Sequence, residues 1–417
     1  MSQDPAGQLF RPYLSTWLRE RIGTPELQPG VVRTCNATLL YADLSGFTRL
    51  TAAFTSLPDG AERLHDALNR CYTALIDVIG AFGGDVPSIA GDALTAWWPD
   101  RTDIDLARRC GTAMLKAVAA LPPLLTPDGP FQLELRIGVS VGEVHATLAG
   151  LPHYGVHFVL TGPALAAAAT AERAAPTGAL AIAAPVPLTL RQSSESPGSE
   201  PGTPLSWEHF LHPNFAERLR QNELIAEYRR CVPVFAAFTV PRRAEDLHPL
   251  VAQVQAVVNR WGGWLNEIEV GDKGAVFVLL FGAPLARGDD PSRAVGCCLE
   301  LRERELISHA GITLGILFVG AVGSPQRRVY TAQGDDMNLA AHLMERAAPG
   351  EILVSGRVRH DVMDRYKTDL PTMIATKGHL EGVPVARMLT GGPRAQRAPG
   401  MMGRYLPDAA ALVGREG

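Results

Sequence analysis

The sequence predicts an α+β protein in which two similar units follow each other in one chain of 417 residues. Two observations support this prediction. An amphipathic helix that ends at a Gly-Gly pair occurs in each half, at Gly83-Gly84 and at Gly262-Gly263. In both halves a hairpin pattern and a later strand follow that pair, and a further glycine then opens another helix. Two copies of domain length indicate tandem domains and not a solenoid.

The first unit is expected to span residues 34–190. Its opening strand is the apolar run 37–42. The helix expected at 61–79 carries apolar side chains on one face at helical spacing, namely Leu64, Leu68, Cys71, Leu75 and Val78. Residues 85–98 alternate as a β-hairpin, and residues 133–140 read as a later strand that leads to Thr161-Gly162 and a further helix.

The second unit is expected to span residues 230–392 and repeats this order. The helix that ends at Gly262-Gly263 has its own apolar face, made of Leu247, Leu250, Val251, Val254 and Val258. Strands are expected at 275–281 and 312–315, and Gly334 opens a helix that includes Met337.

Three segments lie outside the units. Residues 1–33 form an N-terminal segment, and residues 191–229 connect the units. Within this connection, Gln192–Pro204 is rich in Ser, Pro, Gly and Glu and predicts a linker, whereas Phe215–Arg230 predicts a helix that leads into the second unit. Residues 393–417 form a tail.

Composition narrows the class of protein. With 46% hydrophobic and 20% charged residues, the chain has ample material for folded cores. A net charge of −4 gives no electrostatic reason to expect binding to nucleic acid or to an anionic membrane. The six cysteines contain no C-x-x-C pair, and neither a signal pattern nor a run of spanning length occurs. We therefore expect a soluble, cytoplasmic protein with reduced cysteines.

The chemistry is predicted by two carboxylates of the first unit. Asp43 follows an apolar strand in Asp43-Leu44-Ser45-Gly46-Phe47-Thr48, where a helix is expected to begin and to leave amide N–H groups free for an anion. Asp92 follows in the hairpin, after Gly91. Two carboxylates on neighbouring strands beside a helix N-terminus suit two divalent cations that hold a triphosphate. For Asp43 alone, a helix cap is the simpler interpretation.

These motifs together resemble the class III nucleotidyl cyclase domain, the domain of adenylyl and guanylyl cyclases. The second unit carries the resemblance in Gly320-Ala321-Val322-Gly323, Arg327, Tyr330-Thr331, Gly334 and Asn338-Leu339-Ala340-Ala341. Two such units in tandem are most similar to the soluble, bicarbonate-responsive adenylyl cyclase type. The resemblance implies two ferredoxin-like-derived domains that form a pseudo-twofold dimer within the chain, with the site at their interface.

The resemblance assigns the metal and phosphate half of the site to the first unit. Asp43 and Asp92 would bind two Mg²⁺ or Mn²⁺ ions. The amides of Gly46, Phe47 and Thr48, together with the Arg136 guanidinium, would hold the triphosphate. The alternative for Arg136 is a surface arginine at a strand edge.

The second unit would supply ribose and base contacts but no metal site. Ala237 stands where a carboxylate is expected, and Asp272 falls one residue late for a metal ligand and fits a hairpin turn better. Asn338 matches the residue that orients the ribose. Thr331 matches a residue that contacts the purine edge.

Two positions depart from the family pattern. His342 replaces the arginine that stabilises the transition state, and a histidine supplies a cation only when it is protonated. Glu267 replaces the lysine that reads adenine; guanylyl cyclases have Glu there, and a carboxylate accepts from the N1–H and 2-amino group of guanine. The alternative is a solvated charge in a degenerate site. At the positions of the anion-binding cations of the bicarbonate-responsive type the chain has Ser88 and Ala169, so we expect no bicarbonate response.

Two functions remain open. The first is a purine nucleotide cyclase, an adenylate cyclase-type phosphorus–oxygen lyase that converts ATP, or GTP, to the 3′,5′-cyclic monophosphate and pyrophosphate. The second is a catalytically silent cyclase-homology pair that binds nucleotide and regulates a downstream ATPase. The tail sequence Ala411–Gly417 is similar to the lead-in of a signalling-type AAA ATPase module, which would make the chain part of a longer protein.

Overall fold

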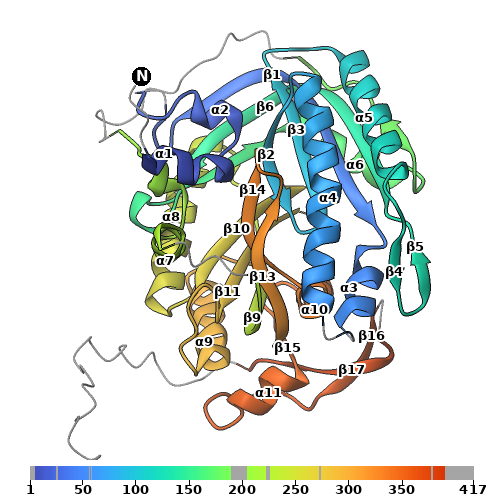
Figure 1. Cartoon of the computed structure of the whole chain (residues 1–417). Helices are drawn as coiled ribbons and strands as arrows, with labels where there is room; N and C mark the ends of the chain where they lie inside the picture. The colour runs from blue at the N-terminus through green and yellow to red at the C-terminus, as the bar shows by residue number, and fades with distance from the viewer. Residues whose placement is uncertain are drawn as a thin grey trace, which may run out of the picture.

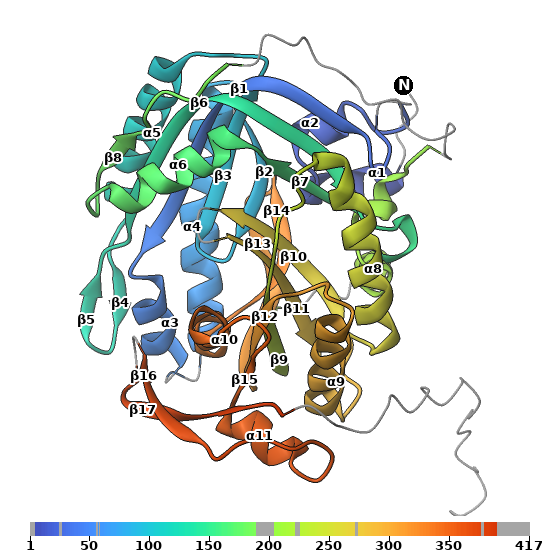
Figure 2. The ribbon, with the colours of Figure 1, turned by 180° about the vertical axis from the view of Figure 1, so that it is seen from behind.

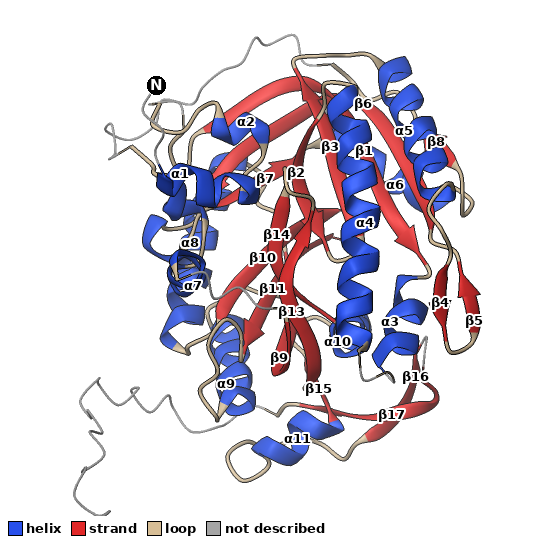
Figure 3. Ribbon diagram, viewed as in Figure 1, coloured by secondary structure: helices blue, strands red, loops and turns tan. Residues whose placement is uncertain are grey.

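Two β-sheets organise the molecule, one from each half of the chain (Figure 1). The computed structural model describes residues 5–24, 27–55, 57, 59–188, 204–221, 226–271, 274–376 and 379–389. The strands meet in the middle of the molecule, and helices surround them (Figure 3). None of the helices in these ranges is both long enough and apolar enough to cross a membrane.

The first sheet has six strands in the order β2-β3-β1-β6-β7, with β8 beside β6. The strands are β1 (Val32–Ser45), β2 (Asp85–Ala90), β3 (Ala93–Pro99), β6 (Glu134–Ala149), β7 (His157–Thr161) and β8 (Leu180–Ile182). The helices of this half are α3 (Phe47–Thr55), α4 (Gly60–Ala81), α5 (Ile104–Ala119) and α6 (Pro163–Ala174), and β4 (Leu124–Thr126) pairs with β5 (Gly129–Phe131) as a separate hairpin. Figure 2 shows α5 and α6 beside this sheet.

The second sheet has nine strands, of which seven follow the order β10-β11-β9-β12-β15-β17-β16. The strands are β9 (Glu227–Phe238), β10 (Trp264–Gly271), β11 (Gly274–Phe281), β12 (His309–Ile312), β13 (Gly315–Gly323), β14 (Arg328–Gln333), β15 (Ile352–Ser355), β16 (Thr372–Thr376) and β17 (His379–Arg387). The helices are α8 (Leu247–Arg260), α9 (Asp290–Glu303), α10 (Asp335–Arg346) and α11 (Gly356–Val362).

Short elements bridge the two halves. The N-terminal segment contains α1 (Pro5–Phe10), the 3-10 turn η1 (Arg11–Tyr13) and α2 (Thr16–Arg19), and the connection contains η3 (Trp207–Phe210) and α7 (Pro213–Arg220). Two further 3-10 turns are η2 (Pro152–Tyr154) and η4 (Ala244–Asp246). Phe10 of the N-terminal segment packs in one apolar cluster with Phe215 of α7 and Tyr330 of β14.

The main predicted elements are confirmed. Helix 61–79 is α4, hairpin 85–98 is β2 and β3, and the second unit's helix is α8. Strand 133–140 is much longer than predicted, because β6 continues to Ala149 and pairs with β1 along the whole length of β1. The pattern at residues 133–140 therefore predicted only the first part of a long strand that pairs antiparallel with β1.

Two predicted elements are wrong. The strand expected at 312–315 falls at the break between β12, which ends at Ile312, and β13, which begins at Gly315. The helix expected at Phe215–Arg230 begins at Pro213 and ends at Arg220, and Glu227–Arg230 already belong to β9. These residues pair with β13, where Arg229 lies opposite Leu317. Tertiary pairing therefore overrides the local helical pattern. The predicted linker Gln192–Pro204 lies outside the described residues except for Pro204, as do the predicted turn at Asp272 and the tail 393–417.

The contacts between the halves are reciprocal. The helix α4 of the first half packs against β13, so that Phe318 and Val322 join the core of the first half. The helix α8 of the second half packs against β6, and Ala149 and Val159 join the core of the second half. A side-chain amide on each helix bonds the opposite backbone: Gly323 N–H donates to Asn69 Oδ1 at 2.9 Å, and Leu151 N–H donates to Gln255 Oε1 at 2.7 Å.

A buried arginine adds a further link between the halves. Arg327 is only 7% exposed, and its guanidinium donates to the carbonyls of Val86 and Pro87 on β2 and to that of Tyr13 in the N-terminal segment. Burial lowers the pKa of Arg327 to about 10, which leaves it charged at neutral pH. These bonds tie the loop before β14 to the edge of the first sheet.

Candidate functional site

A cleft of about 1030 Å³ lies between the two halves, and both halves line it. The first half contributes Asp43, Asp92, Gly46 and Arg136 among other residues. The second half contributes the remaining predicted contacts whose side chains are described: Glu267, Thr331, Asn338 and His342. Residues that are far apart in the sequence, and that were predicted to act together, are thus brought to one cavity.

The two carboxylates are held on adjacent strands. Asp43 lies near the end of β1, opposite Ala93 of β3, and the Leu44 N–H donates to the Asp92 carbonyl at 3.0 Å. The turn between β2 and β3 carries Gly91, whose φ of +58° lies in the region that favours glycine. The Tyr72 hydroxyl donates to the Gly91 carbonyl at 2.8 Å and fixes this turn.

The electrostatics of this pair suit a cation. Burial and, second, the negative charge of Asp43 together raise the pKa of Asp92 to about 8. A divalent cation between them would remove this repulsion, and carboxylate oxygens are the ligands that Mg²⁺ and Mn²⁺ prefer. Among the described residues no cluster of three or more His, Cys, Asp or Glu is arranged for a metal, so nucleotide and water oxygens would have to complete the coordination.

Arg136 is engaged by two carboxylates. Its Nη2 lies 2.6 Å from Asp43 Oδ2, and its Nε lies 3.0 Å from Glu172 Oε1. Glu172, on α6, is only 4% exposed, so this guanidinium is anchored from inside the protein. The planar guanidinium of Arg136 therefore lies between the Asp43 carboxylate and the buried Glu172 carboxylate, at the edge of the cleft.

The helix predicted to bind phosphate is α3. It begins at Phe47 and follows Gly46, which has a φ of +85°. The first backbone amides of a helix have no partner within it, so those at Phe47 and Thr48 are suited to bind an anion. An added Cβ at Gly46 would lie 2.8 Å from the Phe131 ring, which explains the need for glycine before the helix.

Strands β10 and β14 build the side of the cleft that is predicted to contact the base. Glu267 and Thr331 both line the cavity, and Thr331 is 5% exposed. Burial raises the pKa of Glu267 well above its ordinary value, and the neighbouring Glu269 adds to this effect. Burial and Glu269 thus both favour the uncharged form of the Glu267 carboxyl.

The helix α10 carries Asn338 and His342 four residues apart on its cleft side. The His342 side chain is 32% exposed, and its Nδ1 lies 3.4 Å from Glu345 Oε2 on the same helix. The imidazole thus has an acidic neighbour on its own helix, while it remains accessible from the cleft.

The equivalent metal positions of the second half lack carboxylates. Ala237 occupies the β9 position that corresponds to Asp43, and it lies opposite Val276, as Asp43 lies opposite Ala93. The residue before Val276, which corresponds to Asp92, is Ala275 and not Asp272. Ser88 and Ala169 line the same cleft and supply no cation there.

Sequence reasoning missed several polar groups of the cleft. Gln333 donates from Nε2 to the Gly91 carbonyl at 3.3 Å and so links the second half to the turn that holds Asp92. Asn266 donates to Thr331, Glu172 holds Arg136, and Glu269 lies close enough to Asp92 to raise its pKa. The position of Gln333 directly before the helix-opening Gly334 is the one sequence signal that pointed to any of them.

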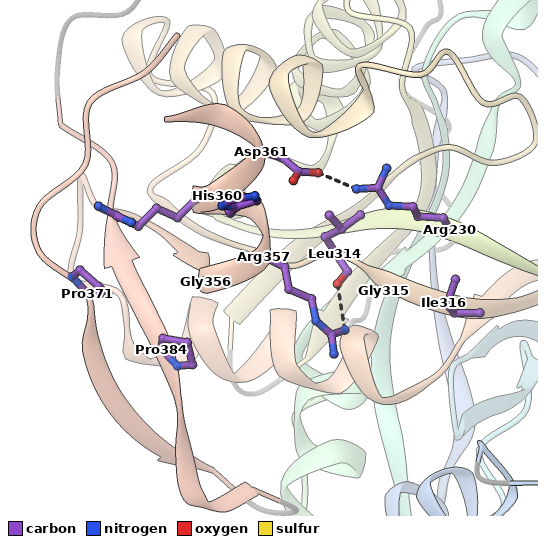
Figure 4. Close-up of a pocket in the computed structure, with 11 residues that line it drawn as sticks. Arg230, Leu314, Gly315, Ile316, Gly356, Arg357, His360, Asp361, Pro371 and Pro384 are labelled. Atoms are coloured by element: carbon purple, nitrogen blue, oxygen red, sulfur yellow. Dashed lines mark hydrogen bonds and ion pairs between the residues drawn. The ribbon is translucent and has the colours of Figure 1, made fainter. Parts of the chain in front are cut away.

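A second hollow, of about 630 Å³, lies on the outside of the second half and shares no lining residue with the cleft (Figure 4). In it Arg230 lies 2.5 Å from Asp361, and Arg357 donates to the Leu314 carbonyl at 3.4 Å. These arginines already have protein partners, and none of the predicted site residues lies here.

The comparisons with known proteins agree with this geometry. Residues 31–199 match the family described as the adenylate and guanylate cyclase catalytic domain. The human protein adenylate cyclase type 10 is 22% identical over 383 residues, and the rabbit protein of the same name (Oryctolagus cuniculus) is 23% identical over 383 residues. Each alignment covers 74% of this chain but only 24% of the relative, so the chain spans about a quarter of the length of the curated relatives it matches.

A solved structure covers most of the chain. A class III adenylyl cyclase-like ATP-binding protein from Pseudomonas aeruginosa has a TM-score of 0.58 and 13% identity over 80% of this chain and 87% of its own. At this identity the likeness shows the fold. Residues 31–199 are thus similar to the adenylate and guanylate cyclase catalytic domain, and the chain as a whole has a fold like that of the solved structure.

Proposed function

We propose that the chain is a purine nucleotide cyclase that converts ATP or GTP to the 3′,5′-cyclic monophosphate and pyrophosphate. The observation that carries this proposal is that Asp43 and Asp92 of one half and Asn338 of the other line a single cleft. The reciprocal packing of α4 on β13 and of α8 on β6 supports an intrachain pseudo-twofold dimer, with domains at 34–190 and 230–392. We place the protein in the cytoplasm, with no membrane or nucleic acid partner.

Asp43 and Asp92 are the residues that would hold two Mg²⁺ or Mn²⁺ ions. When bound, these ions neutralise triphosphate charge and favour ionisation of the ribose 3′-hydroxyl. The protein's share of the work is to hold the nucleotide so that this oxygen faces the α-phosphorus. Fixing that geometry lowers the entropic part of the barrier.

On the phosphate side, the amides at Gly46, Phe47 and Thr48 and the Arg136 guanidinium would bind the triphosphate. Arg136 already points to the metal site through Asp43, so it need only exchange one oxygen partner for another. Glu172 would hold the Nε edge of the Arg136 guanidinium in place during this exchange. On the ribose side Asn338 would hold the sugar, and protonated His342 would face the charge that develops on the phosphate.

The base contact leaves both purines open. A neutral Glu267 can donate to adenine N1. Alternatively, the two donors on the guanine edge would favour the ionised carboxylate, since hydrogen bonds to the charged form stabilise it. Thr331 can donate to guanine O6 or accept from the adenine 6-amino group.

The second candidate function is a catalytically silent pair that binds nucleotide and regulates a downstream ATPase or signalling module. Two observations favour it. His342 replaces an arginine, and the solved structure that covers most of this chain is titled a cyclase-like ATP-binding protein. Retention of both Asp43 and Asp92 favours the enzyme, because a silent site has no chemical need for two metal carboxylates.

The test is a product assay. Purified protein is incubated with Mn²⁺ and either ATP or GTP, and the cyclic nucleotide and pyrophosphate are measured by mass spectrometry and by a coupled assay. An enzyme forms both products in equal amounts. Nucleotide binding without either product, at protein concentrations that saturate the nucleotide, would leave the silent pair as the function.

A further inference from the structure

A side chain behind the cleft controls the hydrogen-bonding character of Thr331. Asn266 precedes Glu267 on β10, and the pairing of β10 with β11 shifts between Leu265 and Glu267. At such a bulge two consecutive residues lie opposite one partner, so Asn266 is released from the regular alternation. Its Nδ2 donates to Thr331 Oγ1 at 3.1 Å across to β14.

This bond decides what Thr331 offers to a ligand. A threonine hydroxyl has one hydrogen to donate and two lone pairs that accept. Among the described residues, Asn266 is the hydrogen-bond partner of this hydroxyl, and it fills a lone pair from the side away from the cavity, which Asn266 does not line. The Thr331 hydrogen is thereby left for a group in the cleft.

We propose that Asn266 holds Thr331 as a hydrogen-bond donor toward the cleft and so selects a purine with a carbonyl at position 6, which is guanine. Adenine has an amino group at this position, and the second lone pair of Thr331 could accept from it only if the buried Thr331 hydrogen turned away from the cleft, where no described residue accepts it. The inference rests on the proposed nucleotide site and names its preferred base. Asn266 is a positioning residue here, since it acts only through Thr331.

The oxygen of the Asn266 amide explains why the choice between guanine and adenine depends on the orientation of this side chain. Asn266 Oδ1 is buried and has no hydrogen-bond partner among the described residues. A rotation of the amide by 180° would bring Oδ1 to Thr331, accept its hydrogen and present lone pairs to the cleft, which is the pattern that adenine needs. The orientation of one amide therefore separates the two purines, and Glu267 reads the adjoining edge of the base in either case.

The test uses equilibrium binding, so that it does not depend on turnover. The α,β-methylene analogues of GTP and ATP cannot expel pyrophosphate, and their affinities in Mn²⁺ are measured by calorimetry. The parent should bind the GTP analogue about tenfold more tightly, the cost of one mismatched polar pair. Asn266→Leu removes the donor and should abolish this preference, and Asn266→Asp, an acceptor, should shift it toward the ATP analogue.

Thr331→Val separates a positioning role from a structural one. In the Thr331→Val background, Asn266→Leu should leave the ratio of the two affinities unchanged, because its effect passes through the hydroxyl. Asn259→Leu, on α8 outside the cleft, is the matched control and should retain the parent ratio.

Each outcome has one meaning. If the parent binds neither analogue, the nucleotide site fails and this inference falls with it. If the parent binds both but prefers the ATP analogue, the assignment of guanine is wrong. If both analogues bind and Asn266→Leu retains the parent ratio, the role of Asn266 is wrong while the nucleotide site stands.

Discussion

The two halves share a backbone plan but differ at the cleft. Where the first half has Asp43, Asp92 and Arg136, the second half has Ala237, Ala275 and His309 at the corresponding register positions. The three side chains of the first half line the cleft, whereas Ala275 is buried in the core of the second half and the cleft lining includes neither Ala237 nor His309. The comparison teaches that the same strand order can be built with or without these polar groups: the second half has it with neither carboxylate.

On helices α6 and α10 it is the second half that carries predicted site residues and the first half that lacks them. Helices α6 and α10 both follow a glycine, and in each half a hydroxyl donates to a carbonyl of the first turn. Ser140 of β6 donates to the Ala164 carbonyl, and Thr313, directly after β12, donates to that of Asp336. This alignment sets Ala166 against Asn338 and Thr170 against His342. Each half thus carries cleft side chains that the other lacks, and the two halves together supply one set of predicted site residues.

The largest effect is expected at the two carboxylates that the first half has and the second half lacks. Asp43→Asn and Asp92→Asn should each reduce cyclic nucleotide formation by more than about 10³-fold and weaken Mn²⁺-dependent nucleotide binding, because a charged oxygen ligand is lost at nearly constant shape. Product is measured by mass and binding by calorimetry. Asp77→Asn on the exposed face of α4 is the matched control and should behave as the parent. Unchanged Mn²⁺-dependent binding in both variants would remove the metal assignment.

The next largest effect is expected at His342. Restoring the family residue with His342→Arg should raise turnover roughly 10- to 1,000-fold, less than the 10³–10⁵ of a full arginine contribution, because a protonated histidine already supplies part of it. The parent should lose activity as pH rises and the imidazole loses its proton, whereas the Arg variant should not. Rates are compared from mildly acidic to alkaline pH. Equal inactivity of both proteins with both nucleotides would contradict the enzyme and favour the silent pair.

A smaller effect is expected at Glu267. Glu267→Lys should shift the ratio of GTP to ATP use about tenfold toward ATP, because a lysine donates to adenine N1 and leaves the guanine donors unpaired, a difference of roughly 1–3 kcal/mol. The ratio of kcat/KM values measures the shift. Ser88→Lys at the corresponding position of the first half is the control and should leave this ratio unchanged. An unchanged ratio in Glu267→Lys would show that Glu267 does not read the base.

The smallest effect concerns the connection and not the site. His212 caps α7 by accepting the Asn214 N–H at 3.2 Å, and burial lowers its pKa to about 4. A lowered pKa means that His212 supports the fold above pH 6.5 and that this support is lost as pH falls toward 4. His212→Asn keeps a cap without a titrating group, so between pH 7.5 and 4.5 it should lose about 1–2 kcal/mol less stability than the parent. Chemical denaturation at the two pH values measures this, and equal losses would contradict it.

Local patterns in the sequence predicted much of the fold. Gly-Gly pairs after apolar helical faces located α4 and α8, and alternation located the hairpins. Local patterns could not predict two strand segments: β6 beyond residue 140 and the start of β9 at Glu227. Pairing with strands that are distant in the sequence defines both segments. For the same reason Gly271-Asp272 resembled a displaced metal motif, while register assigns that position to Ala275.

The site shows the same division. Asp43, Asp92 and Asn338 stand beside recognisable glycines and strand ends, so their place in one cleft could be predicted. Asn266, Glu172 and Gln333 act on other side chains or on a carbonyl across the interface, and no spacing in the sequence encodes those contacts. Residues that support a site from behind are visible only once the chain is folded.

Each half contributes residues to the core of the other, and this has a consequence for dividing the chain into two fragments. Phe318 and Val322 complete one core, and Ala149 and Val159 complete the other. A cut within the connection near residue 200 would yield two fragments, each with an exposed apolar face and an unpaired helix. Neither fragment should fold alone, but co-expression should restore both cores at once, which makes this chain a natural candidate for fragment complementation and for reporting the encounter of two fused proteins.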